Sequence, residues 1–154
     1  YNPQVKPYDY SLETARTMLD KLKEDAADYE LNFELITTPA YEDKAQAIIN
    51  SWAQLGINVN LKIVPFPDTN EYQILLIGQQ IPDDPDQYLL WHSTQQGNIT
   101  RYANPKVDKL LEDGRQEMDL EKRRQIYQEF QRFLVEDSPA AFLEELYTYT
   151  IRRK

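Results

Sequence analysis

The stretch from Gly78 to Tyr102, GQQIPDDPDQYLLWHSTQQGNITRY, gathers the side chains of this sequence that could do chemistry. It holds the only histidine, His92, next to Trp91, and a set of closely spaced carboxylates. Histidine can act as a general base near neutral pH, and carboxylates can hold a hard cation or join in acid–base catalysis. An active site, a ligand-binding loop and a polar turn between two packed elements are the three interpretations to weigh.

A catalytic constellation around His92 is missing from the sequence. There is no cysteine to pair with it, no second histidine for a metal site and no G-x-S-x-G motif. The cluster Asp83, Asp84 and Asp86 has the order D-D-P-D, which lacks the ligand order of an EF-hand loop. These aspartates are therefore expected to shape a turn, with one of them capping the segment DQYLLWHS. We expect no metal and no cofactor; the alternative is a small α/β hydrolase that uses His92 with Asp83 or Asp86.

The residues just before the aspartates suit recognition of a ligand better than catalysis. Gly78 lets a ligand approach the backbone closely, and neutral glutamine amides can both donate and accept hydrogen bonds. Trp91 is a candidate ligand platform, with packing beneath the loop as the alternative. The predicted ligand-binding residues are Gly78, Gln79, Gln80, Ile81, Asp83, Trp91 and His92.

Hydrophobic periodicity predicts strands and helices that would position this stretch. One amphipathic helix is predicted to begin after Ser11, its N-cap, with Met18 and Leu22 on its apolar stripe. A second amphipathic helix is predicted over 45–52 and is ended by Gly56. Strands are predicted over 29–36, 57–64 and 72–77. Strand, helix and strand over about 35 residues match a βαβ unit with two parallel strands. The stretch from Gly78 follows the third strand, and ligands of open α/β sheets gather at the carboxyl ends of strands.

Two further helices and a last strand are predicted beyond Tyr102. Asn104 is expected to cap a helix that has Pro105 at its first position, and Gly114 either ends that helix or marks a weak point in it. A longer helix is predicted from Asp119, and alternation over 147–151 predicts a strand.

The charged residues of the longer helix are expected to face water. An alternative makes them a partner-binding face of a scaffold domain, and the residues concerned are Glu121, Lys122, Arg123 and Arg124.

Composition fits one folded α/β domain over residues 1–154. The chain is 41% apolar and 12% aromatic, enough to fill a core. Its 17 basic and 26 acidic residues give a net charge of −9, which repels nucleic acid, so nucleic acid is not an expected partner. The absence of cysteine excludes disulfides and thiolate metal sites. The start at Tyr1, without an initiator methionine, indicates a piece of something longer.

Six segments in sequence order carry a resemblance to a known family. They are YDYSLETARTMLDKL, AQAIINSWAQLGINVNLKIV, DDPDQYL, ITRYANPKVDKLLEDGRQ, EKRRQIYQEFQRFLVEDSPAAFL and YTYTIRRK. Together they resemble the C-terminal lobe of the family 5 extracellular solute-binding proteins, the peptide- and nickel-type receptors of bacterial ABC importers. The resemblance covers nearly the whole chain.

The resemblance implies a fold and a function. It implies a periplasmic-binding-protein type II-like C-terminal lobe, three-layered, with a mixed β-sheet flanked by helices. It also implies a non-enzymatic receptor that captures an extracellular solute, most simply an oligopeptide. The implied partners are that ligand, the N-terminal lobe of the same parent chain and the membrane permease of the ABC transporter. The implied location is extracytoplasmic, periplasmic or at the cell surface, with the parent protein a membrane-tethered lipoprotein.

The D-P-D match transfers the family's ligand loop onto numbered positions. Counted back without gaps, it places Gly78 where the family has an aromatic residue and Ile81 where it has an amine-binding aspartate. The resemblance therefore leaves Asp83 and Trp91 as the residues that would replace the missing charge and the missing aromatic ring.

Overall fold

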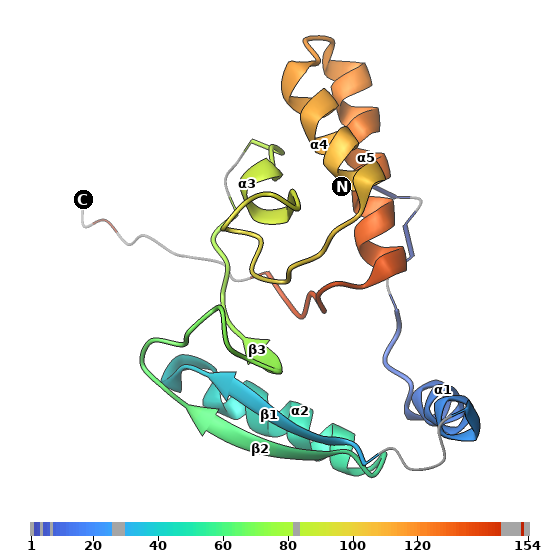
Figure 1. The fold of residues 1–154 in the computed structure, drawn as a ribbon, viewed down its shortest axis with the longest axis vertical. Coiled ribbons are helices and arrows are strands. Elements are labelled where there is room, and N and C mark those ends of the chain that lie inside the picture. Colours follow the sequence, from blue (N-terminus) through green and yellow to red (C-terminus); the bar gives the residue numbers. More distant parts are fainter. Residues whose placement is uncertain are drawn as a thin grey trace. The chain divides into compact units, whose positions relative to one another are not determined.

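The computed structural model describes residues 2–3, 5–6, 8–25, 30–81, 84–145 and 152. The chain divides into two units: a sheet unit, Tyr8–Asp83, and a helical unit formed by Tyr1–Pro7 with Asp84–Lys154. Strands lie in the first and the longest helix in the second (Figure 1), so the predicted α/β class is confirmed.

The sheet unit contains three parallel strands in the order β2-β1-β3 (Figure 1). The strands are β1 (Asn32–Thr37), β2 (Asn58–Ile63) and β3 (Ile74–Leu76), and α2 (Glu42–Ala53) follows β1 through the short helix η1 (Pro39–Tyr41). The predicted parallel βαβ unit is thus confirmed. All described strands are parallel, whereas a mixed sheet was expected; the predicted last strand over 147–151 and Tyr29 lie outside the described residues.

The two faces of the sheet differ in polarity because side chains alternate along each strand. On one face Leu35 pairs in register with Leu61 and Ile74, and it is only 1% exposed. On the other face Asn58 Nδ2 donates a hydrogen bond to Asn32 Oδ1 at 3.0 Å. The helix α2 packs against β1 and β2 (Figure 1). The face with Leu35 therefore supplies apolar core, whereas the opposite face is polar at Asn32 and Asn58 and also carries the buried Ile36.

The first helix, α1 (Leu12–Asp25), begins where the sequence predicts. Ser11 caps it, because Ser11 Oγ accepts a hydrogen bond from Thr14 N at 3.1 Å. The predicted apolar stripe of α1 is not buried as a core-facing stripe would be, because Met18 is 57% exposed and Leu22 is 63% exposed. The described part of the chain therefore leaves much of this stripe uncovered.

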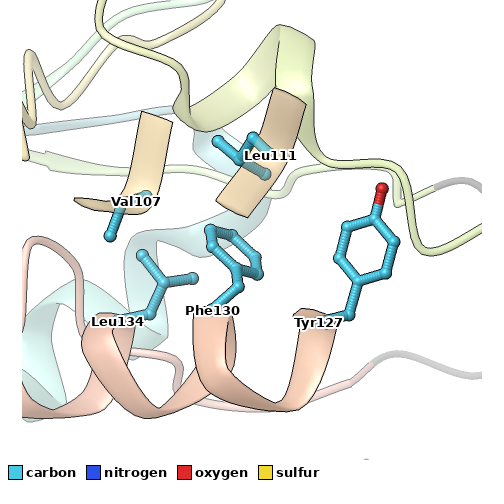
Figure 2. Packing of buried hydrophobic residues seen from close by; sticks show 5 residues of the cluster. All are labelled: Val107, Leu111, Tyr127, Phe130 and Leu134. Carbon is cyan, nitrogen blue, oxygen red and sulfur yellow. The ribbon is translucent and has the colours of Figure 1, made fainter. Parts of the chain in front are cut away.

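The core of the helical unit lies between α4 (Pro105–Gln116) and α5 (Leu120–Asp137). Figure 2 shows the buried side chains of the two helices facing one another; they are Val107, Leu111, Tyr127, Phe130 and Leu134. Their spacing of three, four and seven residues places them on one face of each helix. No helix among the described residues is long and apolar enough to cross a membrane.

Local signals fix the ends of these two helices. Asn104 Oδ1 accepts from Lys106 N at 3.0 Å with Pro105 at the first turn, as predicted. Asp119 caps α5 by accepting from two backbone amides. Gly114 does not end α4, which continues to Gln116.

A glycine is needed at position 114 because the ring of Tyr127 approaches the backbone closely there, and not because the chain turns. A Cβ atom at this position would lie 2.8 Å from Tyr127 Cζ. The phenol ring therefore occupies the space that any other residue would need, and the glycine belongs to the interior of the helix pair.

Candidate functional site

The carboxyl ends of β1 and β3 lie at the same edge of the sheet. Thr37, the last residue of β1, is completely buried, and its Oγ1 donates a hydrogen bond to Leu76 O at 2.8 Å. Val64 N donates to Thr37 O at 2.9 Å, which ties the segment after β2 to the same point. The backbone from which the following loops start is therefore held in place. We refer to Tyr41 and the segment Gly78–Ile81 at this edge as the carboxyl-edge site.

Gly78 lies against an aromatic ring from the loop that follows β1. A Cβ atom on Gly78 would overlap the Tyr41 hydroxyl oxygen and would lie 3.1 Å from Tyr41 Cζ. The space that the sequence assigned to a ligand beside Gly78 is thus partly filled by Tyr41, a residue that sequence reasoning missed. The resemblance places an aromatic side chain at position 78, and here an aromatic ring reaches the same backbone from position 41.

The three residues after Gly78 are exposed. Ile81 is 62% exposed, and Gln79 Nε2 donates a long hydrogen bond, 3.4 Å, to Gln80 O. Their amides and backbone groups therefore remain accessible. Asp83, predicted to supply a charge, lies outside the described residues.

The aspartates of the D-P-D motif shape a turn, as predicted. Asp84 Oδ1 accepts from Asp86 N at 2.8 Å, and Asp86 Oδ1 accepts from Tyr88 N at 3.0 Å. The second contact reaches the first residue of the short helix α3 (Tyr88–Trp91), whose N-cap residue, Gln87, makes no side-chain cap hydrogen bond, so the predicted cap from an aspartate is not formed. Both carboxylates are therefore used to order the backbone.

Two arginines of the helical unit hold this turn. Arg123 Nη2 contacts Asp84 Oδ1 at 2.7 Å, its Nε donates to Gly114 O at 2.9 Å, and its guanidinium lies 5.2 Å from the Tyr127 ring centre. The side chain of Arg123 is 21% exposed, so the expectation that it faces water is wrong. The reason is that a planar guanidinium can bind a carboxylate, a carbonyl and an aromatic face at once.

The second arginine repeats the arrangement. Arg115 Nε lies 3.0 Å from Asp86 Oδ2, and its guanidinium lies 4.5 Å from the Tyr88 ring centre. Each aspartate of the motif thus pairs with a different arginine, and the guanidinium of each arginine packs against a different tyrosine ring.

The Asp84–Arg123 pair is expected to make the stability of the helical unit depend on pH in the acid range. The hydrogen bond from Arg123 lowers the pKa of the Asp84 carboxyl below its usual 3.8. Because the folded-state pKa is lowered, the stabilisation is present above the unfolded pKa and is lost as pH falls through the folded value. We expect Asp84→Asn to weaken the fall in thermal midpoint between about pH 5 and pH 2.

Thermal unfolding followed by circular dichroism at each pH tests this expectation. Arg123→Met should flatten the acid dependence in the same way, and the double variant should add nothing further. An Asp84→Asn variant with the full acid dependence of the wild type would show that the carboxylate contributes nothing.

Trp91 lies at the edge of the core of the helical unit. Its ring packs against the buried cluster of α4 and α5, and it lies 6.0 Å from the Phe142 ring. The half-buried indole fits the packing alternative better than that of a ligand platform.

His92 is buried beneath the loop that follows α3. It is 5% exposed, its Nδ1 lies 2.9 Å from Thr94 Oγ1, and its ring stacks 4.3 Å from Tyr88. Among the described residues, the carboxylates within 4.0 Å of its ring nitrogens are Asp108, near Nδ1, and Glu112, near Nε2. Of the two aspartates that the hydrolase alternative could use, Asp86 pairs with Arg115, and Asp83 lies outside the described residues.

The two carboxylates near His92 face opposite ring nitrogens, so the three groups do not converge on one point. Within the described ranges, no group of three or more His, Cys, Asp or Glu side chains could hold a metal ion. The arrangement around His92 is therefore a packed polar cluster in which the carboxylates do not form a metal-binding geometry.

Comparison with known proteins shows which proteins the chain is similar to. No protein-family model matches the chain. The oligopeptide-binding protein AppA of Bacillus subtilis (strain 168) is 28% identical over 113 residues, 66% of this chain and 21% of AppA. The solved structure of AppA in complex with a nonapeptide has a TM-score of 0.78 at 24% identity, over 90% of this chain and 32% of that chain.

Two further solved structures have a fold similar to that of this chain. DppA from Helicobacter pylori, an ABC transporter-associated periplasmic binding protein in complex with the peptide STSA, has a TM-score of 0.79 at 25% identity, covering 90% of this chain and 30% of that chain. NikZ from Campylobacter jejuni, in complex with Ni(L-His), has a TM-score of 0.78 at 25% identity, and the match covers 87% of this chain and 32% of the NikZ chain.

These matches confirm the resemblance to the peptide- and nickel-type solute-binding proteins of family 5. The chain has the fold of one part of such proteins, and it spans about a fifth of the curated AppA sequence and about a third of the solved chains. Its relatives are binding proteins and not enzymes, which argues against the hydrolase alternative.

Proposed function

We propose that this chain is one lobe of the solute-binding component of an ABC importer and that its ligand is an oligopeptide. The observation that carries the proposal is the carboxyl-edge site, where exposed amides and a tyrosine gather beside a fixed sheet edge. Gly78, Gln79, Gln80 and Ile81 are the contacting residues in this proposal, and AppA and DppA, both solved with peptides, support the ligand class.

The rest of the receptor follows from the same proposal. The partner lobe belongs to the same parent chain and closes on the ligand from the other side, and the closed receptor delivers the ligand to a membrane permease. Capture takes place outside the cytoplasm, with the parent protein tethered to the membrane. The residues that complete the affinity lie in the partner lobe, so this chain alone is expected to bind weakly.

Ligand-induced stabilisation of the full-length protein that carries this chain tests the proposal. A bound ligand stabilises the folded state by about 2.7 kcal/mol at a concentration of about 100 times Kd. We expect nonapeptides and tetrapeptides to raise the thermal midpoint, while sugars and nickel chelates leave it unchanged. Stabilisation by a nickel chelate alone would replace the peptide by a metal complex, and no stabilisation by any of these solutes would overturn the receptor function.

A further inference from the structure

Two loops meet at the carboxyl-edge site, and they come from strands that hydrogen-bond to each other. Tyr41 ends η1, four residues after β1, and Gly78 follows β3 by two residues. The last residues of these strands, Thr37 and Leu76, are partners in the sheet and are joined by a side-chain hydrogen bond. The approach of the Tyr41 ring to Gly78 is therefore set by the sheet itself.

The ring and the glycine depend on each other. Any side chain at position 78 would begin with a Cβ atom that overlaps the Tyr41 hydroxyl. Tyr41 can keep its place only while residue 78 has no side chain, and the bare backbone of Gly78 remains exposed beside it. The pair thus presents a peptide-like backbone strip next to an aromatic ring.

A half-buried tyrosine at such an edge has the properties of a ligand contact. Its ring offers apolar area with only two rotatable side-chain bonds, so little conformational entropy is lost when a ligand packs on it. Its hydroxyl can donate and accept a hydrogen bond. The neighbouring residues Gln79 and Gln80 offer amides but no apolar ring.

We propose that Tyr41, held against Gly78, contacts the bound peptide and selects for an apolar or aromatic peptide side chain. This inference rests on the proposed peptide-binding function and adds the residue that discriminates among peptides. Tyr41 acts by direct contact through its side chain, and Gly78, whose backbone is a proposed ligand contact, also leaves the Tyr41 ring its space because it has no side chain.

Isothermal titration of the full-length protein with two nonapeptides tests the inference. One nonapeptide carries leucine and phenylalanine side chains, and the other carries serine and glycine at the same positions. We expect the wild type to prefer the apolar nonapeptide by about tenfold or more in Kd, and Tyr41→Ala to reduce this preference to within about twofold. Tyr10→Ala, which removes a tyrosine that is 75% exposed in the same unit, should leave the preference unchanged.

A double-mutant cycle of Gly78→Ala and Tyr41→Ala tests whether the effect of residue 78 on peptide binding acts through the Tyr41 ring. Gly78→Ala should weaken apolar-peptide binding because the new methyl group displaces the Tyr41 ring, and it should have little further effect in a Tyr41→Ala background. Should Tyr41→Ala fail to fold, Tyr41→Leu keeps apolar volume, and nuclear Overhauser contacts between peptide protons and the Tyr41 ring in the wild type provide a readout without substitution.

The outcomes distinguish the two proposals. Peptide binding by the wild type with the same apolar preference in Tyr41→Ala, or without contacts to the Tyr41 ring, overturns the role of Tyr41 and leaves the receptor function standing. Binding of neither nonapeptide by the wild type overturns both. Loss of the preference in Tyr41→Ala with retained binding of the serine and glycine peptide supports the inference.

Discussion

Leu111→Ala is expected to lower the free energy of unfolding of the helical unit by about 2–5 kcal/mol. Leu111 is completely buried between α4 and α5, where it contacts the cluster that includes Phe130 and Leu134. Truncation removes buried apolar atoms and leaves a cavity that two packed helices can close only in part. For a unit of this size, such a loss is a large share of the total stability.

Urea denaturation followed by tryptophan fluorescence measures this effect. Trp91 packs against the cluster, so a Trp52→Phe background makes the emission report on the helical unit. Leu120→Ala is the matched control, because Leu120 begins α5 but is 78% exposed, and it should change the free energy by less than about 0.5 kcal/mol. Equal effects of the two substitutions would contradict the placement of the core.

Gly114→Ala is expected to destabilise the helical unit by about 1–2 kcal/mol, although alanine is the better helix former. In an exposed helix interior the same change would stabilise by about 0.8–1.0 kcal/mol. Here the added Cβ would lie 2.8 Å from Tyr127 Cζ and 3.0 Å from its hydroxyl oxygen. The overlap forces the ring or the helix to shift, and this outweighs the gain in propensity.

The same urea denaturation experiment in a Tyr127→Leu background tests whether the Tyr127 ring causes the destabilisation by Gly114→Ala. Tyr127→Leu removes the ring atoms that the new Cβ would meet, so Gly114→Ala should become neutral or stabilising in that background. A stabilising Gly114→Ala in the wild-type background would show that the ring moves freely and that Gly114 is only a weak point in the helix.

Local signals in the sequence predicted most elements of the fold. The alternation around Phe33 and Val59 predicted two parallel strands, and the caps Asn104 and Asp119 placed the starts of the last two helices. These predictions succeeded because each depends on neighbours within one or two turns of chain.

Long-range contacts within each unit could not be predicted in the same way. Arg123 reaches Asp84, a residue 39 positions away, and Tyr41 meets Gly78 across two loops. No periodic pattern encodes such a pair. The one usable signal was that parallel strands end at a common edge, which would have directed attention to the loop after β1 as well as to the loop after β3.

The polar residues around His92 show a second limit. The residue type of His92 suggested catalysis, but His92 is buried and 5% exposed. Its neighbour Asn98 is also 5% exposed and orders the same loop, because its Nδ2 donates a hydrogen bond to Tyr102 O at 2.8 Å. Residue type alone does not separate a buried hydrogen-bonding amide or imidazole from a reactive one, because the distinction lies in partners and geometry.

The sheet unit is one uninterrupted stretch of chain, whereas the helical unit takes residues from both ends. A recombination event with breakpoints near residues 8 and 83 would therefore exchange the strands, Tyr41 and Gly78 as a single block. The ring and the glycine that accommodates it would be inherited together. Under the proposed function, such an exchange changes peptide preference in one step, while the helix pair α4 and α5 keeps its own sequence.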